Sequence, residues 1–373
     1  MIFFLILGLS LAAAQVPLGL PGSPEFGFGA RLDIWGQQVN PAINAASGMG
    51  LDWIAVDFDW GRYWPEANTL PDLNNLHQVM EAAQRVNLSV LLSITNAPSW
   101  AISNHGPDPE LTAGLVLSLY RLFPDTLLAI ELFPAANQVS GWGKQPDPAA
   151  YATLLKITNS IMRESGANIV IVAGGFTPLG SDRTAADVED KVFLESLYKL
   201  GAAAYMPVIG IRLEGTTGSP LAANGNKEPV TLRHFEELRR IMLKNNHQHG
   251  LIWITGFSWP TETNQEDSRV GSIYDEQAVW LNQAYRMLHS HLYIGAAFFD
   301  RLNPPGISER RPHTVSAITG SNNSLILPDE SLHPACNVVS QLAAGNANIN
   351  TVIFEGSISK KTPLKIELKP SGP

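Results

Sequence analysis

Charged side chains stand at or near the ends of several apolar runs that read as strands. They are Glu131, Arg212, Glu214, Asp300 and Arg301. Carboxyl groups held near a reacting bond can donate and accept protons, an assistance worth roughly 10²–10⁴-fold in rate. Arginine presents a planar fork of donors that suits carboxylate, polar or anionic ligands. These positions are therefore the first candidates for chemistry or for ligand binding.

Their spacing separates structural carboxylates from exposed ones. Asp57 and Asp59 share the parity of one strand, so we expect Asp57 to be hydrogen-bonded inside the fold and Asp59 to lie nearer a cleft. Glu131 precedes its strand end, and a buried carboxylate is costly without a partner, so we expect a structural role for it. Arg212 and Glu214 alternate along one strand, which predicts that they project the same way as an ion pair.

The elements that must position these residues alternate between strand and helix. The predicted strands are Phe26–Ile34, Trp53–Phe58, Ser89–Ile94, Leu127–Leu132, Ile169–Ala173, Val208–Leu213, Leu251–Thr255 and Leu292–Phe299. The predicted helices between and after them are Leu73–Val86, Leu111–Leu122, Pro148–Glu164, Val192–Leu200, Leu232–Leu243, Asp275–Leu288 and Leu332–Ala344. Near-continuous apolar strands indicate a parallel sheet that helices cover, and eight such units favour a closed (β/α)8 TIM barrel.

Composition agrees with one large globular domain. The 373 residues are 45% hydrophobic and 16% charged, with a formal net charge of −9. A barrel of roughly 250 residues with loop insertions fits this length. The acidic balance and the lack of a large basic block argue against nucleic acid as a partner. No glycine-rich dinucleotide or phosphate fingerprint follows an early strand, so we expect no cofactor.

The two ends of the chain differ from the barrel. Residues 1–14 are an apolar run ending in small residues, which favours a secretory signal peptide over a short membrane anchor and predicts a secreted or cell-envelope protein. Residues 15–25 are rich in Pro and Gly and read as a linker. Residues 345–373 contain two strand-like runs, which predict a β-hairpin or linker tail through which a protein partner could bind.

Two strand ends carry a specific resemblance. Residues 130–137 read IELFPAAN and residues 253–261 read WITGFSWPT. They resemble the catalytic strand ends of retaining TIM-barrel glycoside hydrolases of clan A, nearest to families 39 and 5. Those families end the two strands in Trp-Asn-Glu-Pro-Asn and Thr-Glu-Phe-Gly-Trp, with the glutamates as acid/base and nucleophile. This sequence has Ala135 and Gly256 at those two positions, and neither side chain can act on a sugar.

Further blocks carry the resemblance across residues 26–344. Residues 48–65 resemble the family's second-strand block, residues 88–101 its third strand and the loop that follows, and residues 147–175 its fourth helix and fifth strand. The sixth strand has Arg212 where the family has a histidine. The departures concentrate at the strand ends where such barrels hold their active sites.

The resemblance and the composition of the strand ends together suggest a glycan site. Aromatic faces stack on sugar rings, although the same tryptophans could be anchors of the core. The candidate substrate-binding residues are Trp60, Trp64, Asn96, Trp100, Asn137, Trp142, Arg212, Trp259 and Arg301. The histidines fall on predicted helices or at their ends, away from this face, so we expect no metal site.

Three hypotheses follow from these observations. The first is a glycoside-hydrolase-like barrel that has lost retaining hydrolysis and binds a glycan or polysaccharide, or serves in a surface assembly. The second is an active O-glycosyl hydrolase with relocated carboxylates drawn from Asp59, Glu214 and Asp300. The third is a structural or partner-binding module whose cleft is filled.

Overall fold

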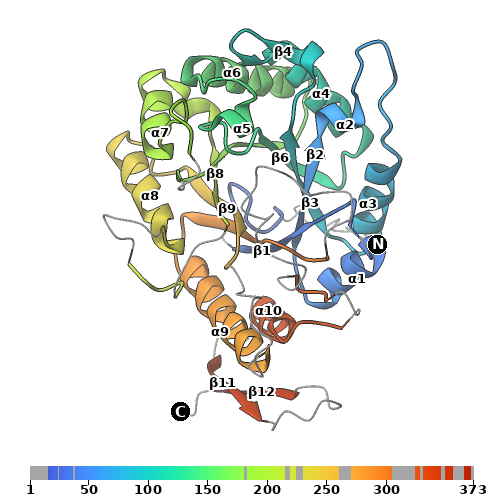
Figure 1. The fold of residues 1–373 in the computed structure, drawn as a ribbon, viewed down its shortest axis with the longest axis vertical. Coiled ribbons are helices and arrows are strands. Elements are labelled where there is room, and N and C mark those ends of the chain that lie inside the picture. The colour runs from blue at the N-terminus through green and yellow to red at the C-terminus, as the bar shows by residue number, and fades with distance from the viewer. Residues whose placement is uncertain are drawn as a thin grey trace, which may run out of the picture.

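Eight parallel strands close into a barrel in the order β1-β10-β9-β8-β7-β6-β3-β2 (Figure 1). They are β1 (Gly27–Leu32), β2 (Trp53–Asp59), β3 (Ser89–Thr95), β6 (Leu127–Leu132), β7 (Val170–Phe176), β8 (Val208–Leu213), β9 (Leu251–Phe257) and β10 (Ile294–Phe299). The computed structural model describes residues 16–23, 25–36, 38–179, 183–214, 219–223, 230–259, 270–304, 324–327, 331–345, 349–355 and 365–370. The predicted TIM barrel is confirmed, and each strand overlaps its predicted range.

Helices surround the barrel and cover the outer faces of its strands (Figure 1). They are α1 (Val39–Gly48), α2 (Trp60–Tyr63), α3 (Asn74–Arg85), α4 (Pro109–Leu122), α5 (Val139–Trp142), α6 (Pro148–Glu164), α7 (Asp190–Lys199), α8 (Phe235–Lys244), α9 (Val270–His289) and α10 (Ala335–Ala343). The start of α6 follows from sequence, because Asp147 accepts hydrogen bonds from the backbone N–H groups of Ala149 and Ala150, and Pro148 takes the first helical position.

One helix that the sequence pattern did not predict is α1. Its buried face consists of Ala42, Ile43 and Ala46, and Pro41 lies within its first turn. Two alanines and one isoleucine make a weak apolar stripe, so the 3.6-residue period is hard to see in the sequence. Packing against the barrel stabilises this helix more than its own propensity does.

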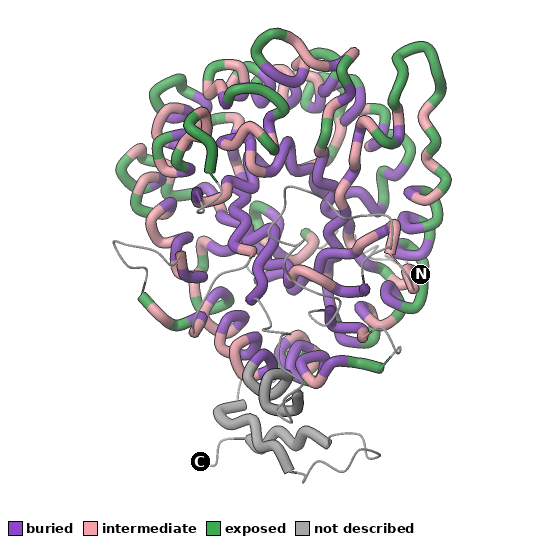
Figure 2. Tube along the Cα trace, viewed as in Figure 1, coloured by how far each residue is buried: buried purple, intermediate pink, exposed green. Residues whose placement is uncertain are grey.

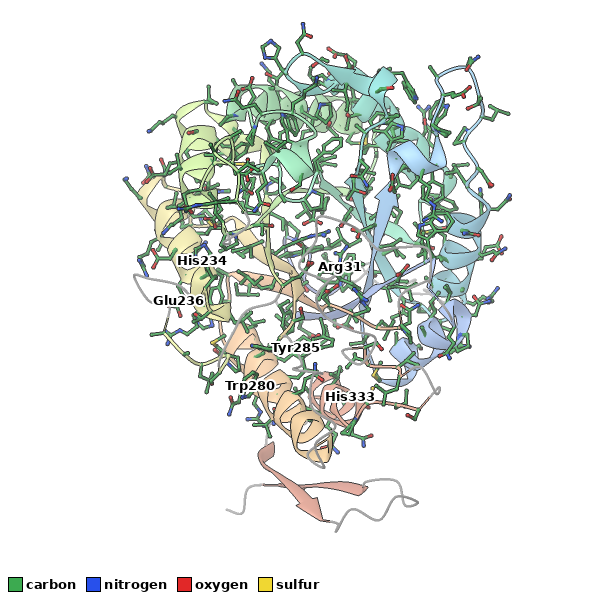
Figure 3. The ribbon with its side chains drawn as sticks, in the orientation of Figure 1. Arg31, His234, Glu236, Trp280, Tyr285 and His333 are labelled. Carbon is green, nitrogen blue, oxygen red and sulfur yellow. The ribbon has the colours of Figure 1, made fainter. Side chains whose placement is uncertain are left out.

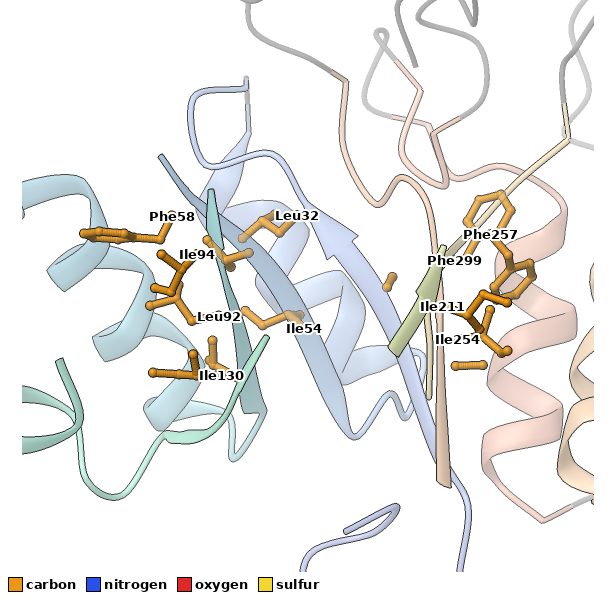
Figure 4. Packing of buried hydrophobic residues seen from close by; sticks show 14 of the residues in the cluster. Leu32, Ile54, Phe58, Leu92, Ile94, Ile130, Ile211, Ile254, Phe257 and Phe299 are labelled. Carbon is orange, nitrogen blue, oxygen red and sulfur yellow. The ribbon is translucent and has the colours of Figure 1, made fainter. Parts of the chain in front are cut away.

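The apolar core has two layers. The outer layer lies between strands and helices and includes Ile54, Leu92 and Ile254, which Figure 4 shows on the faces of their strands. The inner layer fills the barrel itself with residues such as Trp53 and Phe298. Buried positions accordingly follow the strands, whereas exposed positions lie on the outer helices and loops (Figure 2). A filled interior leaves the strand ends as the place for a site.

The Pro- and Gly-rich segment that we expected to be a linker contributes to the N-terminal end of the barrel. Leu20 is buried in the inner layer. The indole N–H of Trp53 donates to the carbonyl of Leu18 at 2.7 Å, and that of Trp253 donates to the carbonyl of Gly19 at 3.0 Å. Residues 18–20 therefore belong to the barrel, because they cover its N-terminal end.

The C-terminal tail forms the hairpin that its strand-like runs predicted. Strands β11 (Ile349–Glu355) and β12 (Lys365–Pro370) pair antiparallel. A short hairpin of β4 (Ile102–Ser103) and β5 (Gly106–Pro107) follows the third barrel strand. In the ranges that the structure describes, no helix is long and apolar enough to span a membrane. The predicted signal peptide or anchor, residues 1–14, lies outside those ranges.

Candidate functional site

A layer of polar side chains crosses the barrel near the C-terminal ends of its strands. The strand register aligns Asp57 of β2 with Ser93 of β3, and Ser93 with Glu131 of β6. Residues at the same level of neighbouring parallel strands project to the same side. The three side chains therefore meet inside the barrel, directly below its mouth.

Arg212 of β8 joins two carboxylates in this layer. Its Nη2 donates to Oδ1 of Asp57 and to Oε2 of Glu131, both at 3.1 Å. The hydroxyl of Ser93 donates to the same Oε2 at 2.6 Å. Burial alone would lower the pKa of Arg212, but the nearby carboxylates of Asp57, Glu131 and Glu214 outweigh burial and raise it. The guanidinium is therefore a permanent cation that fixes the two carboxylates.

Glu131 is fully buried, as we expected for a structural carboxylate, and two glycines make room for it. A Cβ added to Gly175 would lie 2.5 Å from Oε1 of Glu131, and one added to Gly210 would lie 2.8 Å from it. Among the described residues, Oε1 has no hydrogen-bond partner. The carboxylate is thus held through Oε2, while Oε1 rests against bare backbone.

A second arginine completes the layer, and sequence reasoning missed it. Arg31 of β1 lies in the barrel interior (Figure 3), where Nη1 donates to the carbonyl of Thr255 at 2.8 Å and Nη2 bonds Asp57. Its Nε lies 3.8 Å from Oδ1 of Asp300. A signal was present in the sequence, because a lone arginine in an otherwise apolar strand needs a buried partner.

Glu214 enters the mouth from the end of β8. Its Oε1 lies 3.8 Å from Nη1 of Arg212, so the predicted ion pair exists but is looser than a hydrogen bond. Burial raises the pKa of Glu214 to about 7, with a further increase from Asp300, although Arg212 and Arg31 oppose both effects. This carboxyl group is therefore partly protonated at neutral pH.

The position that a family nucleophile would take is bare. Gly256 sits in β9 beside Arg212, and a Cβ built on it would lie 2.5 Å from Oε1 of Glu214. Glu214 therefore occupies the space into which a side chain at position 256 would extend.

The position at which the resemblance expects the acid/base lies in a tight turn after β6. Ala135 has a left-handed backbone with φ 58°. Its N–H donates to the carbonyl of Gly175 at 2.9 Å, and its own carbonyl accepts from the N–H of Gln138 at 2.8 Å. The turn is fixed from both sides, and it presents only a methyl group.

Asp59, one of the candidate relocated carboxylates, accepts a hydrogen bond at each of its oxygens. Its Oδ1 accepts from the backbone N–H of Arg62 at 3.0 Å and so caps α2, while its Oδ2 accepts from Nδ2 of Asn96 at 2.9 Å. Both oxygens are committed to holding the loops after β2 and β3. Asn96, a candidate ligand residue, serves the same structural purpose through its amide.

Four other candidate ligand residues are buried anchors. Trp60, Trp142 and Trp259 are at most 2% exposed, so they present no open face to a sugar. The indole of Trp142 donates to the carbonyl of His105 at 2.8 Å. Asn137 donates to the carbonyls of Thr177 and Val188, both at 2.9 Å. These four side chains therefore pack into the protein. The three tryptophans are anchors of the core, which was the alternative to stacking on sugar rings.

Two tryptophans on the mouth side of the barrel keep exposed surface. Trp64 follows β2 and Trp100 follows β3, and their rings meet edge to face with centroids 5.1 Å apart. The indole N–H of Trp100 donates to the carbonyl of Trp64 at 3.2 Å. Both side chains are partly buried.

Arg301, the remaining candidate ligand residue, is half-buried. Its backbone carbonyl accepts a hydrogen bond from the N–H of Leu325 at 3.0 Å.

The described residues contain no group of three or more His, Cys, Asp or Glu side chains that could hold a metal ion. The site is instead a network of two guanidiniums and four carboxyl groups. The carboxyl groups belong to Asp57, Glu131, Glu214 and Asp300.

Comparison with solved structures identifies the architecture. A family 39 glycoside hydrolase from the gut symbiont Bacteroides cellulosilyticus WH2 matches with a TM-score of 0.64 and 17% identity, over 88% of this chain and 66% of the other. GH5_18 from Streptomyces cattleya, in complex with GlcNAc, matches with a TM-score of 0.60 and 14% identity, over 87% and 81%. The chain therefore shares the barrel fold of these glycoside hydrolases.

Beta-glycosidase BGL167 shares this barrel too, with a TM-score of 0.56 and 14% identity over 83% of this chain and 86% of the other. No family profile matches this sequence, and no curated protein matches it either. At such identities the likeness establishes the fold alone. The chain spans 66% of the length of the Bacteroides enzyme.

Proposed function

We propose that this glycoside-hydrolase-like barrel binds a glycan and does not carry out retaining hydrolysis. The observation that supports this most directly is the pair Ala135 and Gly256 at the mouth, where the resemblance expects two glutamates. Retaining hydrolysis needs two carboxyl groups roughly 5 Å apart on either side of the scissile bond. A methyl group and a bare backbone supply neither the proton donor nor the nucleophile.

Asp57 and Glu131 do not replace those glutamates. Asp57 and Glu131 both accept from Nη2 of Arg212, and Glu131 is fully buried. Both carboxylates are thus tied to a buried guanidinium inside the barrel, where they stabilise the fold.

The mouth still offers contacts for a carbohydrate. Trp64 and Trp100, in the loops that follow β2 and β3, are only partly buried, and the side chains of Glu214 and Asp300 are 14% and 13% exposed. Structures that share the barrel include an endo-beta-1,4-glucanase and an exo-beta-1,4-mannosidase. We therefore choose β-1,4-linked oligosaccharides as the first ligand class.

Titration of the purified protein with cellohexaose, mannohexaose and xylohexaose tests this proposal. We expect saturable binding of at least one oligosaccharide, lost in the Trp64→Ala/Trp100→Ala variant because stacking on the ring faces disappears. The matched control is Leu70→Ala, which removes an apolar side chain that is 92% exposed. No binding in the whole panel, or equal binding by the double variant, would refute the proposal.

The second candidate function is hydrolysis by a relocated acid. It is favoured by the pKa of Glu214 near 7, because a general acid works best when its pKa lies near the working pH. Hydrolysis of the same oligosaccharides that disappears in Glu214→Gln would establish it. The other candidate carboxylates, Asp59 and Asp300, stay predictions, and Asp59 already accepts one hydrogen bond at each oxygen.

We also propose that the protein is secreted or attached to the cell envelope and that its C-terminal hairpin contacts a partner. The apolar residues 1–14 suggest export or attachment to the cell envelope, where extracellular glycans are available. The β11–β12 hairpin is a separate two-stranded sheet, which suits contact with a partner protein or a surface assembly. Fractionation of the host cells, with detection of this protein in each fraction, tests the location.

A further inference from the structure

We infer that the mouth of the barrel takes a glycan that carries ammonium groups, and that the carboxylates of Glu214 and Asp300 bind these groups. The inference rests on the proposed glycan binding and names the class of sugar that the mouth selects. Glu214 directly follows β8 and Asp300 directly follows β10, and their side chains are 14% and 13% exposed. Both carboxyl groups are therefore within reach of a ligand at the mouth.

The network at the mouth holds more carboxyl groups than cations. It has two guanidiniums, and its four carboxyl groups belong to Asp57, Glu131, Glu214 and Asp300. In the part of the chain that the structure describes, Glu214 and Asp300 each have one ion-pair contact, with one of these two guanidiniums. Two carboxyl groups of the network therefore lack a cation of their own.

The guanidiniums make their hydrogen bonds to the interior carboxylates. Nη2 of Arg212 donates to Asp57 and to Glu131, both at 3.1 Å, and Nη2 of Arg31 bonds Asp57 as well. Even so, Oε1 of the fully buried Glu131 has no hydrogen-bond partner among the described residues. Cationic donors are therefore scarce throughout the network, and the interior carboxylates take the close ones.

The carboxyl groups at the mouth receive only the looser contacts. Nη1 of Arg212 lies 3.8 Å from Oε1 of Glu214, and Nε of Arg31 lies 3.8 Å from Oδ1 of Asp300. Both distances exceed that of a hydrogen bond. Glu214 and Asp300 are therefore the two carboxyl groups whose charge the network balances least.

The protonation of Glu214 agrees with this shortage of cations. Burial raises the pKa of Glu214 to about 7, with a further increase from Asp300, although Arg212 and Arg31 lower it. An opposite charge bound nearby favours the ionised form of a carboxyl group. A cationic ligand would therefore supply what the two arginines do not.

An ammonium group on a sugar fits this mouth better than a metal ion or a neutral sugar. Its three N–H donors and full charge suit carboxylate oxygens that the guanidiniums leave without a hydrogen bond. No group of three or more metal-ligating side chains lies among the described residues. Trp64 and Trp100, both partly buried, supply aromatic surface for the ring of the sugar. An oligosaccharide of glucosamine combines both features.

Calorimetric titration at pH 6 with a chitosan hexamer, N-acetylchitohexaose and cellohexaose tests the inference. The three share a β-1,4-linked backbone and differ at C2 of each ring, which carries an ammonium group, an acetamido group or a hydroxyl. We expect the chitosan hexamer to bind at least about 10-fold more tightly than the other two, a difference of about 1.4 kcal/mol. Equal or tighter binding of either neutral hexamer would overturn the inference.

Two double variants separate the mouth from general attraction of a polycation to a protein of net charge −9. Glu214→Gln/Asp300→Asn should bind the chitosan hexamer no more tightly than cellohexaose. The matched control, Glu81→Gln/Glu164→Gln, removes two exposed carboxylates from α3 and α6 and should keep the preference. If the mouth variant does not fold, Glu214→Gln alone should weaken the preference. A preference that persists in the mouth variants, or disappears in the control, would overturn the inference.

The same titrations distinguish failure of this inference from failure of the proposed function. Saturable binding of cellohexaose without any preference for the chitosan hexamer would overturn the inference and leave the proposed glycan binding in place. Binding of the chitosan hexamer alone, with the expected loss in the mouth variant, would support both. Absence of binding for every oligosaccharide, the chitosan hexamer included, would overturn both.

Discussion

Glu214 and Gly256 share one volume at the mouth of the barrel. The carboxyl oxygen of Glu214 lies 2.5 Å from the point where a Cβ on Gly256 would stand, so a side chain at position 256 requires Glu214 to turn aside. The bare backbone at position 256 and the present position of Glu214 are therefore linked in space. This relationship limits the introduction of a carboxylate at position 256.

Introducing the two glutamates that the resemblance expects should give little activity while Glu214 is present. In Ala135→Glu/Gly256→Glu the new side chain at position 256 meets Glu214 and joins a site that already holds excess negative charge. Adding Glu214→Gly vacates the space. We expect the triple variant to hydrolyse a β-1,4-linked oligosaccharide at least about 10-fold faster than the double variant, since general acid assistance alone is worth roughly 10²–10⁴-fold. Equal rates, measured by product chromatography, would show that Glu214 does not block the position.

Removing the cation of the interior network should destabilise the barrel strongly. Arg212→Met leaves the buried carboxylate of Glu131 without its guanidinium, and breaking a buried pair in this way typically costs about 3–5 kcal/mol. The control Arg240→Met removes an exposed pair with Glu237, which is worth about 0–1 kcal/mol. Urea unfolding measures the free energy of unfolding of both variants. Similar losses in the two would show that Arg212 stabilises the fold no more than an exposed ion pair does.

Two glycines with the same backbone conformation allow a matched test of the space around Glu131. Gly175 and Gly166 both have φ +70°, but a Cβ at Gly175 would lie 2.5 Å from Oε1 of Glu131, whereas nothing lies within 4 Å of one at Gly166. We expect Gly166→Ala to cost about 1–2 kcal/mol from the left-handed backbone alone. Gly175→Ala should cost clearly more, and equal losses in thermal or urea unfolding would show that Glu131 moves aside freely.

Stability should fall as the pH rises through the titration of Glu214. Its pKa is raised from 4.5 to about 7, so the folded protein holds the proton more tightly than the unfolded chain does. The resulting stability is fully present below pH 4.5 and is lost as the pH approaches and passes 7. The free energy of unfolding of Glu214→Gln, measured from pH 4.5 to 8, should fall less over this range than that of the wild type. Parallel curves would show that the pKa of Glu214 is not raised in the folded state.

The sequence predicted the scaffold better than the site. Continuous apolar runs mark buried parallel strands, so the barrel strands were found close to their observed bounds, and Asp147 with Pro148 identified the start of α6. Helix α1 was missed because its apolar face is built mainly from alanine.

The site depends on contacts between strands that are distant in sequence, and local patterns do not report these. The link from Arg31 to Asp57 and Asp300 joins three strands, and no spacing rule reveals it. Similarly, nothing in the sequence shows that Asp59 caps α2 or that Trp142 packs inward. The pairing of Arg212 with Glu214 was predictable, because alternate residues of one strand share a face.

Isothermal titration calorimetry with cellohexaose, mannohexaose and xylohexaose tests the central claim most directly, because saturable binding and continuing turnover give different heat signals. We predict saturable heats for at least one oligosaccharide, lost in Trp64→Ala/Trp100→Ala, with no sustained heat flow after mixing. Sustained heat flow from hydrolysis by the unaltered protein would contradict the claim that the barrel binds glycan without cleaving it.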